Sequence, residues 1–214
     1  MSSVSTGRDP ATFSFELYPP RSALAEASLF ASIDRLAAAR PEFISVTYRP
    51  TGDDRAASLA VLDKLIREHK VQAMAHLTCV GSSFGEASRV IREFLDAGVT
   101  SFLAVRGDPP AGAHEGDSFL GDFESASELV QLIHRVQAER SPFTFHEVPG
   151  SMSGRRIRRG HKVTIAVATF PNGHPRSRSR AQDIDTLLAK EAAGANLAIS
   201  QLFFHADEYL GFVD

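Results

Sequence analysis

Several side chains capable of acid–base or recognition chemistry stand at the ends of short apolar segments in this sequence. The first is Glu16, in the segment 12–20, whose apolar residues and two closing prolines predict a strand. A carboxyl group there, walled by Phe15 and Tyr18, would be poorly hydrated and could keep a proton to donate as a general acid. The structural alternative is an ordinary surface carboxylate at a strand terminus.

Three more predicted strand ends carry polar groups. His76 lies in the segment AHLTC. Arg106, Gly107 and Asp108 put a charged pair on a turn, where the glycine leaves room for a flat ligand near the backbone. Gln201 precedes two aromatic residues, and its amide could recognise the edge of a heterocycle. Each has a structural alternative, either an ion pair that orders a loop or a polar group satisfied inside the fold.

Common nucleotide-binding and metal-binding motifs are missing. No G-x-G-x-x-G follows a predicted strand and no G-x-x-x-x-G-K-[ST] occurs, which leaves neither a Rossmann fingerprint nor a P-loop. The histidines form no H-E-x-x-H pair. The single cysteine, Cys79, excludes an internal disulfide and a cysteine-cluster metal site. We therefore expect no metal site.

The elements that must position these residues alternate regularly along the chain. Apolar segments and amphipathic stretches follow one another six times, and the predicted strands lie at 12–20, 43–50, 74–80, 101–110, 162–171 and 197–204. Two of the intervening helices should end at Gly98 and Gly194, glycines placed as C-caps. Repeated units of this kind predict an α/β fold with a mainly parallel sheet.

Two arrangements fit this alternation: a doubly wound open sheet and a (β/α)8 TIM-type barrel. The polar residues at the predicted strand ends are Glu16, Thr47, His76, Arg106, Asp108 and Gln201. In a barrel the carboxyl ends of the strands converge on one face, where barrel enzymes carry their sites. In an open sheet they would spread along one edge. The convergence favours the barrel.

The chain holds only about six βα units, and an eight-stranded barrel needs two more. We expect a disordered leader at 1–11 and an incomplete (β/α) barrel catalytic domain at 12–214. The segment at about 138–161, rich in glycine and arginine, reads as an exposed insertion. Unpaired strand edges would favour association into a homo-oligomer.

Composition sets further bounds. The 214 residues carry 23 Lys and Arg against 26 Asp and Glu, a net charge of −3 that argues against a dedicated nucleic-acid binder. No run approaches the roughly 18 to 20 apolar residues of a membrane span. The N-terminal residues lack the apolar core of a secretory signal. A cytoplasmic protein fits these features.

Seven segments together carry a family resemblance that none carries alone. They are FSFELYPPR, FISVTY, AHLTC, LAVRGDPP, FPNGHP, AKEAAGANLAISQLFF and YLGFVD. In this order and spacing, apart from the insertion, they resemble the methylenetetrahydrofolate reductase family over residues 12–214. The resemblance implies a (β/α)8 oxidoreductase of one-carbon and methionine metabolism. Such an enzyme reduces 5,10-methylenetetrahydrofolate to 5-methyltetrahydrofolate with NADH or NADPH, through bound FAD.

The resemblance also implies roles for individual residues. Glu16 matches the general acid that opens the folate ring, and Asp108 matches an aspartate beside flavin and folate whose charge would stabilise the developing cation. Gln201 matches a residue that contacts the pterin. The positions that match FAD-binding residues are Thr47, His76, Arg106, Gly107, Asp108, Asp183 and Lys190.

The departures from the family pattern fall mostly on the flavin side. Phe170 replaces a common tyrosine, and Ala189 precedes Lys190 where a second basic residue is usual. Two alternatives therefore stay open. The chain could transfer hydride directly from NADH to folate without flavin, as some members of the family do. Because two βα units are missing, it could also be an inactive truncated paralogue that acts as a binding module.

Overall fold

The computed structural model describes residues 12–48, 54–78, 80–108, 121–140, 143–146, 155–158 and 163–213. The predicted leader at 1–11 and Cys79 lie outside these residues. The main sheet consists of β1 (Ser14–Leu17), β2 (Phe43–Val46), β3 (Ala73–Thr78), β4 (Ser101–Val105), β7 (Thr164–Thr169) and β8 (Leu197–Ser200). The helices are α1 (Ala23–Ala38), α2 (Asp54–Arg67), α3 (Phe84–Asp96), α4 (Ala126–Arg140), α5 (Arg180–Ala192) and α6 (Ala206–Val213).

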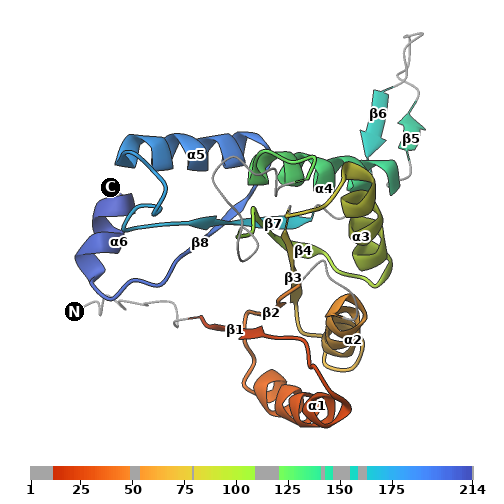
Figure 1. The fold of residues 1–214 in the computed structure, drawn as a ribbon. Coiled ribbons are helices and arrows are strands. Elements are labelled where there is room, and N and C mark those ends of the chain that lie inside the picture. Colours follow the sequence, from red (N-terminus) through yellow and green to blue (C-terminus); the bar gives the residue numbers. More distant parts are fainter. Residues whose placement is uncertain are drawn as a thin grey trace, which may run out of the picture.

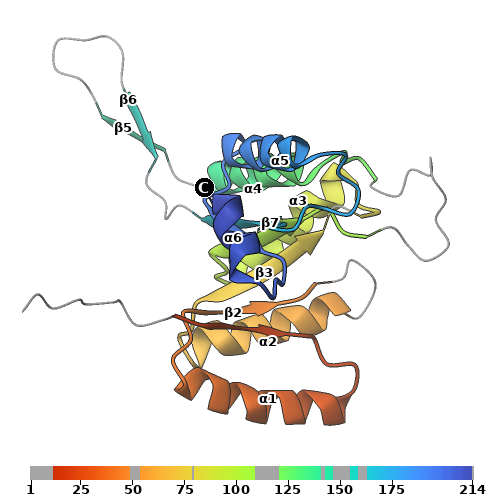
Figure 2. The same ribbon diagram turned by 90° about the vertical axis from the view of Figure 1, so that its left-hand side faces the viewer.

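The six strands form one parallel sheet in the order β1-β2-β3-β4-β7-β8. Each strand therefore pairs with the main-sheet strand that follows it in the sequence. The sheet curls, and the helices cover its convex side (Figures 1 and 2). A doubly wound sheet would reverse its order and carry helices on both faces. The structure thus confirms a partial (β/α)8 barrel and excludes the open-sheet alternative.

Alternation along each strand separates the two faces of the sheet. Ile44, Phe102 and Ile165 are fully buried on the convex face, under the helices. Phe15 pairs with Ile44 in the parallel register and packs against the same core, so Glu16, the next residue, points to the concave face. The side chains on the concave face include Glu16, Thr47, His76, Thr78 and Gln201.

Both predicted glycine caps are confirmed. Gly98 ends α3 with a φ of 91°, and Gly194 ends α5 with a φ of 110°. Positive φ angles cost little at glycine because it has no Cβ. These turns return the chain to β4 and β8 within a few residues.

A second, two-stranded sheet follows α4. β5 (Phe143–His146) and β6 (Arg155–Arg158) pair in an antiparallel register. Both views show this hairpin pointing away from the main sheet (Figures 1 and 2). It falls within the predicted insertion at about 138–161, although α4 continues to Arg140. That the whole insertion is exposed stays a prediction.

Candidate functional site

The predicted acid lies beside a histidine of another strand. Glu16 on β1 and His76 on β3 both belong to the concave face, and Oε1 of Glu16 lies 4.0 Å from Nδ1 of His76. The Glu16 side chain is 48% exposed and that of His76 only 13%. The predicted wall around Glu16 is not observed, because Phe15 points to the opposite face and Tyr18 is 65% exposed. The glutamate is therefore hydrated, with a buried imidazole on one side.

Burial controls the protonation of His76. Loss of hydration lowers its pKa from 6.5 to about 4, so the imidazole is neutral near pH 7. A carboxylate nearby would favour the imidazolium, but that of Glu16 is half exposed and water screens its charge. Desolvation therefore outweighs the nearby carboxylate and lowers the pKa of His76.

Two polar atoms on the concave side of β3 have no partner within the described chain. They are Nε2 of His76 and Oγ1 of Thr78, and both are buried. An unsatisfied buried donor or acceptor costs about 1–3 kcal/mol. A ligand or a water molecule that supplied the missing hydrogen bonds would recover part of that cost.

Thr47 lies at the end of β2, level with His76 in the strand register. Its hydroxyl donates to the carbonyl of Leu17 at 3.3 Å, and its backbone N–H donates to the same oxygen at 2.9 Å. These bonds extend the pairing of β1 with β2 by one residue and hold the top of the glutamate-bearing strand in place.

A second polar group gathers at the ends of β4 and β7. Lys190 donates from Nζ to the carbonyl of Ala168 at 2.8 Å, and burial followed by the charge of Arg106 lowers the pKa of this lysine. Asp183 accepts from the backbone N–H of His174 at 3.2 Å and from the hydroxyl of Ser177. Asp183 thus orders the loop that joins β7 to α5, and Lys190 ties α5 to β7 itself.

His174 belongs to the same group, although the sequence did not single it out as a site residue. Its ring packs edge-on against Phe170, with the centroids 4.7 Å apart. Burial and the nearby charge of Arg106 lower its pKa. The charges of Arg106, Asp183 and Lys190 all act on His174, so these groups lie near one another. The FPNGHP segment after β7 was the signal that could have found His174.

The turn after β4 brings the backbone close to β3. Gly107 has a φ of 87°, and a Cβ on it would lie 2.5 Å from Cγ2 of Val80. A side chain is therefore excluded at this position. Asp108 follows, is exposed, and has no hydrogen bond or ion pair with the described residues.

Gln201 continues β8, where its backbone N–H donates to the carbonyl of Thr169 at 2.7 Å. Its side chain is exposed at the edge of the sheet. The structure thus places the predicted site residues at the carboxyl ends of the strands in two groups. Glu16, Thr47 and His76 lie on β1 to β3, whereas Arg106, Asp183 and Lys190 lie around β4, β7 and α5. No contact between Asp108 or Gln201 and Glu16 is observed in the described part of the chain.

One further match to a catalytic pattern has a structural explanation. Gly81 to Gly85 read GSSFG, which fits the G-x-S-x-G of a nucleophile elbow between strand and helix. Ser83 instead caps α3: its Oγ accepts from the backbone N–H of Glu86 at 3.2 Å and contacts the Glu86 carboxylate at 2.9 Å. This reciprocal capping box occupies the hydroxyl.

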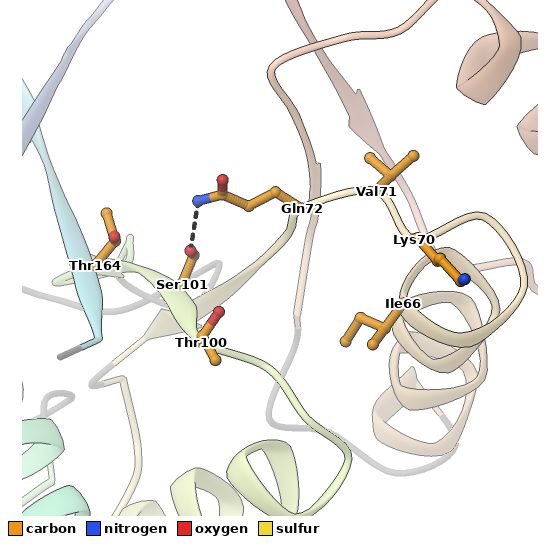
Figure 3. A pocket seen from close by; sticks show the side chains of 7 residues that line it. All are labelled: Ile66, Lys70, Val71, Gln72, Thr100, Ser101 and Thr164. Atoms are coloured by element: carbon orange, nitrogen blue, oxygen red, sulfur yellow. Dashed lines mark hydrogen bonds between the residues drawn. The ribbon is translucent and has the colours of Figure 1, made fainter. Parts of the chain in front are cut away.

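A groove of about 460 Å³ lies at the opposite end of the sheet (Figure 3). Polar residues at the amino ends of the strands line it, and Gln72 donates to the hydroxyl of Ser101 at 3.0 Å across it. This face of a (β/α) barrel serves stability, whereas chemistry takes place at the carboxyl ends. We therefore place the candidate site on the other face.

No helix in the described ranges is long and apolar enough to cross a membrane. A family model described as Methylenetetrahydrofolate reductase matches residues 3–214. The 5,10-methylenetetrahydrofolate reductase of Escherichia coli (strain K12) is 31% identical over 201 residues, which are 94% of this chain and 58% of that protein. Methylenetetrahydrofolate reductase (NADH) 1 of Zea mays is 28% identical over 94% of this chain and 32% of its own length. The chain thus spans little more than half of the bacterial relative.

Solved structures are similar in fold at low identity. A 2,3-dimethylmalate lyase superimposes with a TM-score of 0.57 at 10% identity, over 95% of this chain and 62% of that one. An uncharacterized protein from Clostridium thermocellum, which binds two copies of 5-methyl-5,6,7,8-tetrahydrofolic acid, gives 0.56 at 12% identity, over 95% and 58%. At such identities the likeness supports the barrel-type fold alone.

Proposed function

The chain belongs to the methylenetetrahydrofolate reductase family, and from that premise we propose that it reduces 5,10-methylenetetrahydrofolate to 5-methyltetrahydrofolate with NAD(P)H. The observation that carries the proposal is Glu16 on the concave face beside the buried His76. This is the position at which a (β/α) barrel presents catalytic groups to a substrate. The cytoplasm, which the composition suggested, is the proposed location.

Glu16 supplies the proton in this proposal. Hydride transfer needs an electrophilic carbon, and protonating the leaving nitrogen of the bridged folate opens the ring to an iminium ion. A hydrated carboxyl group can collect a proton from solvent and deliver it to a nitrogen bound above the sheet. The half-exposed Glu16 side chain suits this task, since bulk water reaches it in the absence of substrate.

Asp108 and Gln201 complete the proposed folate site. The exposed carboxylate of Asp108, which has no partner among the described residues, would stabilise the positive charge that develops on the iminium ion. The Gln201 amide can both donate and accept, as the edge of a pterin requires. Both side chains are exposed to solvent.

The flavin-side residues fit FAD on three features of the fold. His76 and Thr78 have buried polar atoms that find no partner in the described part of the chain. Gly107 leaves the backbone without a side chain, at a position where a Cβ would collide with Val80. The positive charges of Arg106 and Lys190 suit a pyrophosphate. The residues that would hold FAD are Thr47, His76, Arg106, Gly107, Asp108, Asp183 and Lys190. Bound FAD would accept hydride from NAD(P)H and supply it to the folate.

A second candidate, direct hydride transfer from NADH to the same folate, has its own support. Two of the proposed FAD residues are already engaged within the protein, Lys190 with the Ala168 carbonyl and Asp183 with the loop before α5. Phe170 also lacks the hydroxyl that is common at its position. These contacts would have to open, or be shared, for both residues to hold a cofactor.

The test is formation of 5-methyltetrahydrofolate by the purified chain, with NADH or NADPH and with or without added FAD. Product that requires FAD, with a retained flavin band that bleaches on adding NADH, supports the flavin route. Product without FAD supports direct transfer. Absence of product under all four conditions from a folded chain would overturn both and leave the third reading, a binding module.

A further inference from the structure

The positions of the hydrogen atoms determine which residue donates and which accepts in the contact between Glu16 and His76. A neutral imidazole carries one N–H, on Nδ1 or on Nε2. The nitrogen that faces the Glu16 oxygen is Nδ1. An ionised carboxylate can only accept. A favourable contact with ionised Glu16 therefore requires the proton of His76 to sit on Nδ1.

The other strands beside His76 offer no competing charge. From β2, the hydroxyl of Thr47 already donates to the Leu17 carbonyl. From β4, the residue paired with His76 in the register is the apolar Leu103. Within the described residues, Glu16 is thus the charged group in contact with this imidazole.

The hydrogen-bonding role of the second ring nitrogen, Nε2, follows from the protonation of Nδ1. With the proton on Nδ1, Nε2 carries a lone pair and can only accept a hydrogen bond. Nε2 is buried and has no partner in the described chain, and the hydroxyl of Thr78, two residues along the same face, is equally unpartnered. A bound molecule with an N–H or O–H group would satisfy Nε2.

We propose that Glu16 fixes the tautomer of His76 with its proton on Nδ1, so that Nε2 is a preset acceptor for a ligand hydrogen-bond donor on the concave face. His76 is thereby also a positioning residue, because its N–H attracts the Glu16 carboxylate. The 4.0 Å separation is longer than a hydrogen bond, and the half-exposed glutamate can move closer. The tautomer itself requires only the Glu16 carboxylate as an acceptor; that the ligand belongs to a folate reduction rests on the proposed function.

The test is the tautomer of His76 in the ligand-free chain. A long-range ¹H–¹⁵N correlation spectrum at pH 7 distinguishes the two neutral tautomers of each of the eight histidines, and His76→Gln identifies the signals of His76. Spectra of Glu16→Ala and of Glu16→Leu, which keeps bulk without an acceptor, show what the carboxylate contributes. Ser14→Ala, an exposed change on the same face of β1, is the matched control.

Two other histidines serve as internal references. His134 contacts the Gly194 carbonyl through Nε2 at 2.9 Å, which requires the proton on Nε2 because a carbonyl only accepts. His174 accepts the backbone N–H of Arg176 on Nδ1 at 3.1 Å, which likewise leaves its proton on Nε2. Both patterns should be the same in every variant and report that the fold is intact.

The expected result is His76 protonated on Nδ1 in the wild type and in Ser14→Ala, and on Nε2 in both Glu16 variants. A wild-type His76 already protonated on Nε2 would overturn the proposal, as would a His76 that keeps its tautomer when Glu16 is removed. The spectra need neither folate nor cofactor. Failure here is therefore distinct from failure to form 5-methyltetrahydrofolate.

Discussion

At the scale of single residues, the concave face places an exposed carboxylate beside a buried imidazole. The Glu16 side chain is 48% exposed to solvent, whereas His76, 4.0 Å away, is buried and stays neutral. Both properties suit the proposed reduction. An acid must regain its proton from solvent, and a neutral group can offer a fixed hydrogen bond. Alternation along β1 creates this contrast, because Phe15 turns to the core and leaves Glu16 on the open face.

The buried His76 also predicts how stability depends on pH. Its pKa is about 4 in the fold against 6.5 in the unfolded chain, so the unfolded state binds more protons between these values. Stability contributed by neutral His76 is complete above pH 6.5 and falls as the pH drops toward 4. At pH 4.5 we expect a loss of roughly 2–3 kcal/mol from this group.

Urea unfolding at pH 7 and pH 4.5 measures this effect. Other groups also titrate over this range, so the comparison is with His76→Gln, which cannot take up a proton. From pH 7 to pH 4.5, the decrease in the free energy of unfolding should be smaller in His76→Gln than in the wild type, by about 2–3 kcal/mol. Equal drops in the two proteins would show that His76 is not held neutral by burial.

At the scale of elements, the turns that return each helix to the sheet position the site. Gly194 ends α5 with a φ of 110°, and its carbonyl contacts His134 of α4. A Cβ at Gly194 would lie 2.4 Å from Nε2 of this histidine. The same turn leads into β8 and so to Gln201.

A matched pair of glycine substitutions tests this turn. Gly98→Ala forces a positive φ on alanine, but its Cβ would meet only Ile66, at an ordinary 3.7 Å, so strain of about 1–2 kcal/mol is expected. Gly194→Ala adds the collision with His134, which costs a further ~1–3 kcal/mol. Chemical denaturation of both variants, and of Gly194→Ala combined with His134→Ala, measures the difference. Equal losses at the two glycines would contradict the steric account.

Local pattern predicted the elements well and the side-chain surroundings less well. All six strand segments and both glycine caps were located because apolar runs, prolines and glycines act over a few residues. Phe15 was wrongly expected to wall Glu16, although alternation already places neighbours on opposite faces. The engagement of Lys190 with the Ala168 carbonyl and the effect of Arg106 on His174 could not be predicted, since both join segments that are distant in the sequence.

At the scale of the whole molecule, the described residues form an open, curled sheet with unpaired strands at both edges. Large apolar side chains are exposed on α5, on β8, on α6 and on the loop between β8 and α6: Ile184, Leu188, Leu197, Leu202, Phe204, Tyr209, Leu210 and Val213. This cluster, together with an unpaired strand edge, favours association.

We therefore expect the chain to self-associate in solution. Sedimentation velocity should show an apparent mass that rises with concentration. Phe204→Glu combined with Leu210→Glu should reduce that rise, because the added charges oppose burial of the cluster. Gln131→Glu, on an exposed position of α4, adds charge away from the edge and should leave association unchanged. A strictly monomeric wild-type chain at all concentrations would contradict this expectation.

The central claim, that Glu16 protonates the folate, is tested most directly by the rate of 5-methyltetrahydrofolate formation in Glu16→Gln. The amide keeps the size and exposure of the side chain but has no acidic proton to donate, so the rate should fall by about 10²–10⁴-fold. Oxidation of NADH by any bound flavin should stay near the wild-type rate, because that step needs no acid at the folate nitrogen. Folate reduction that survives the substitution, in a variant that folds normally, would contradict the account.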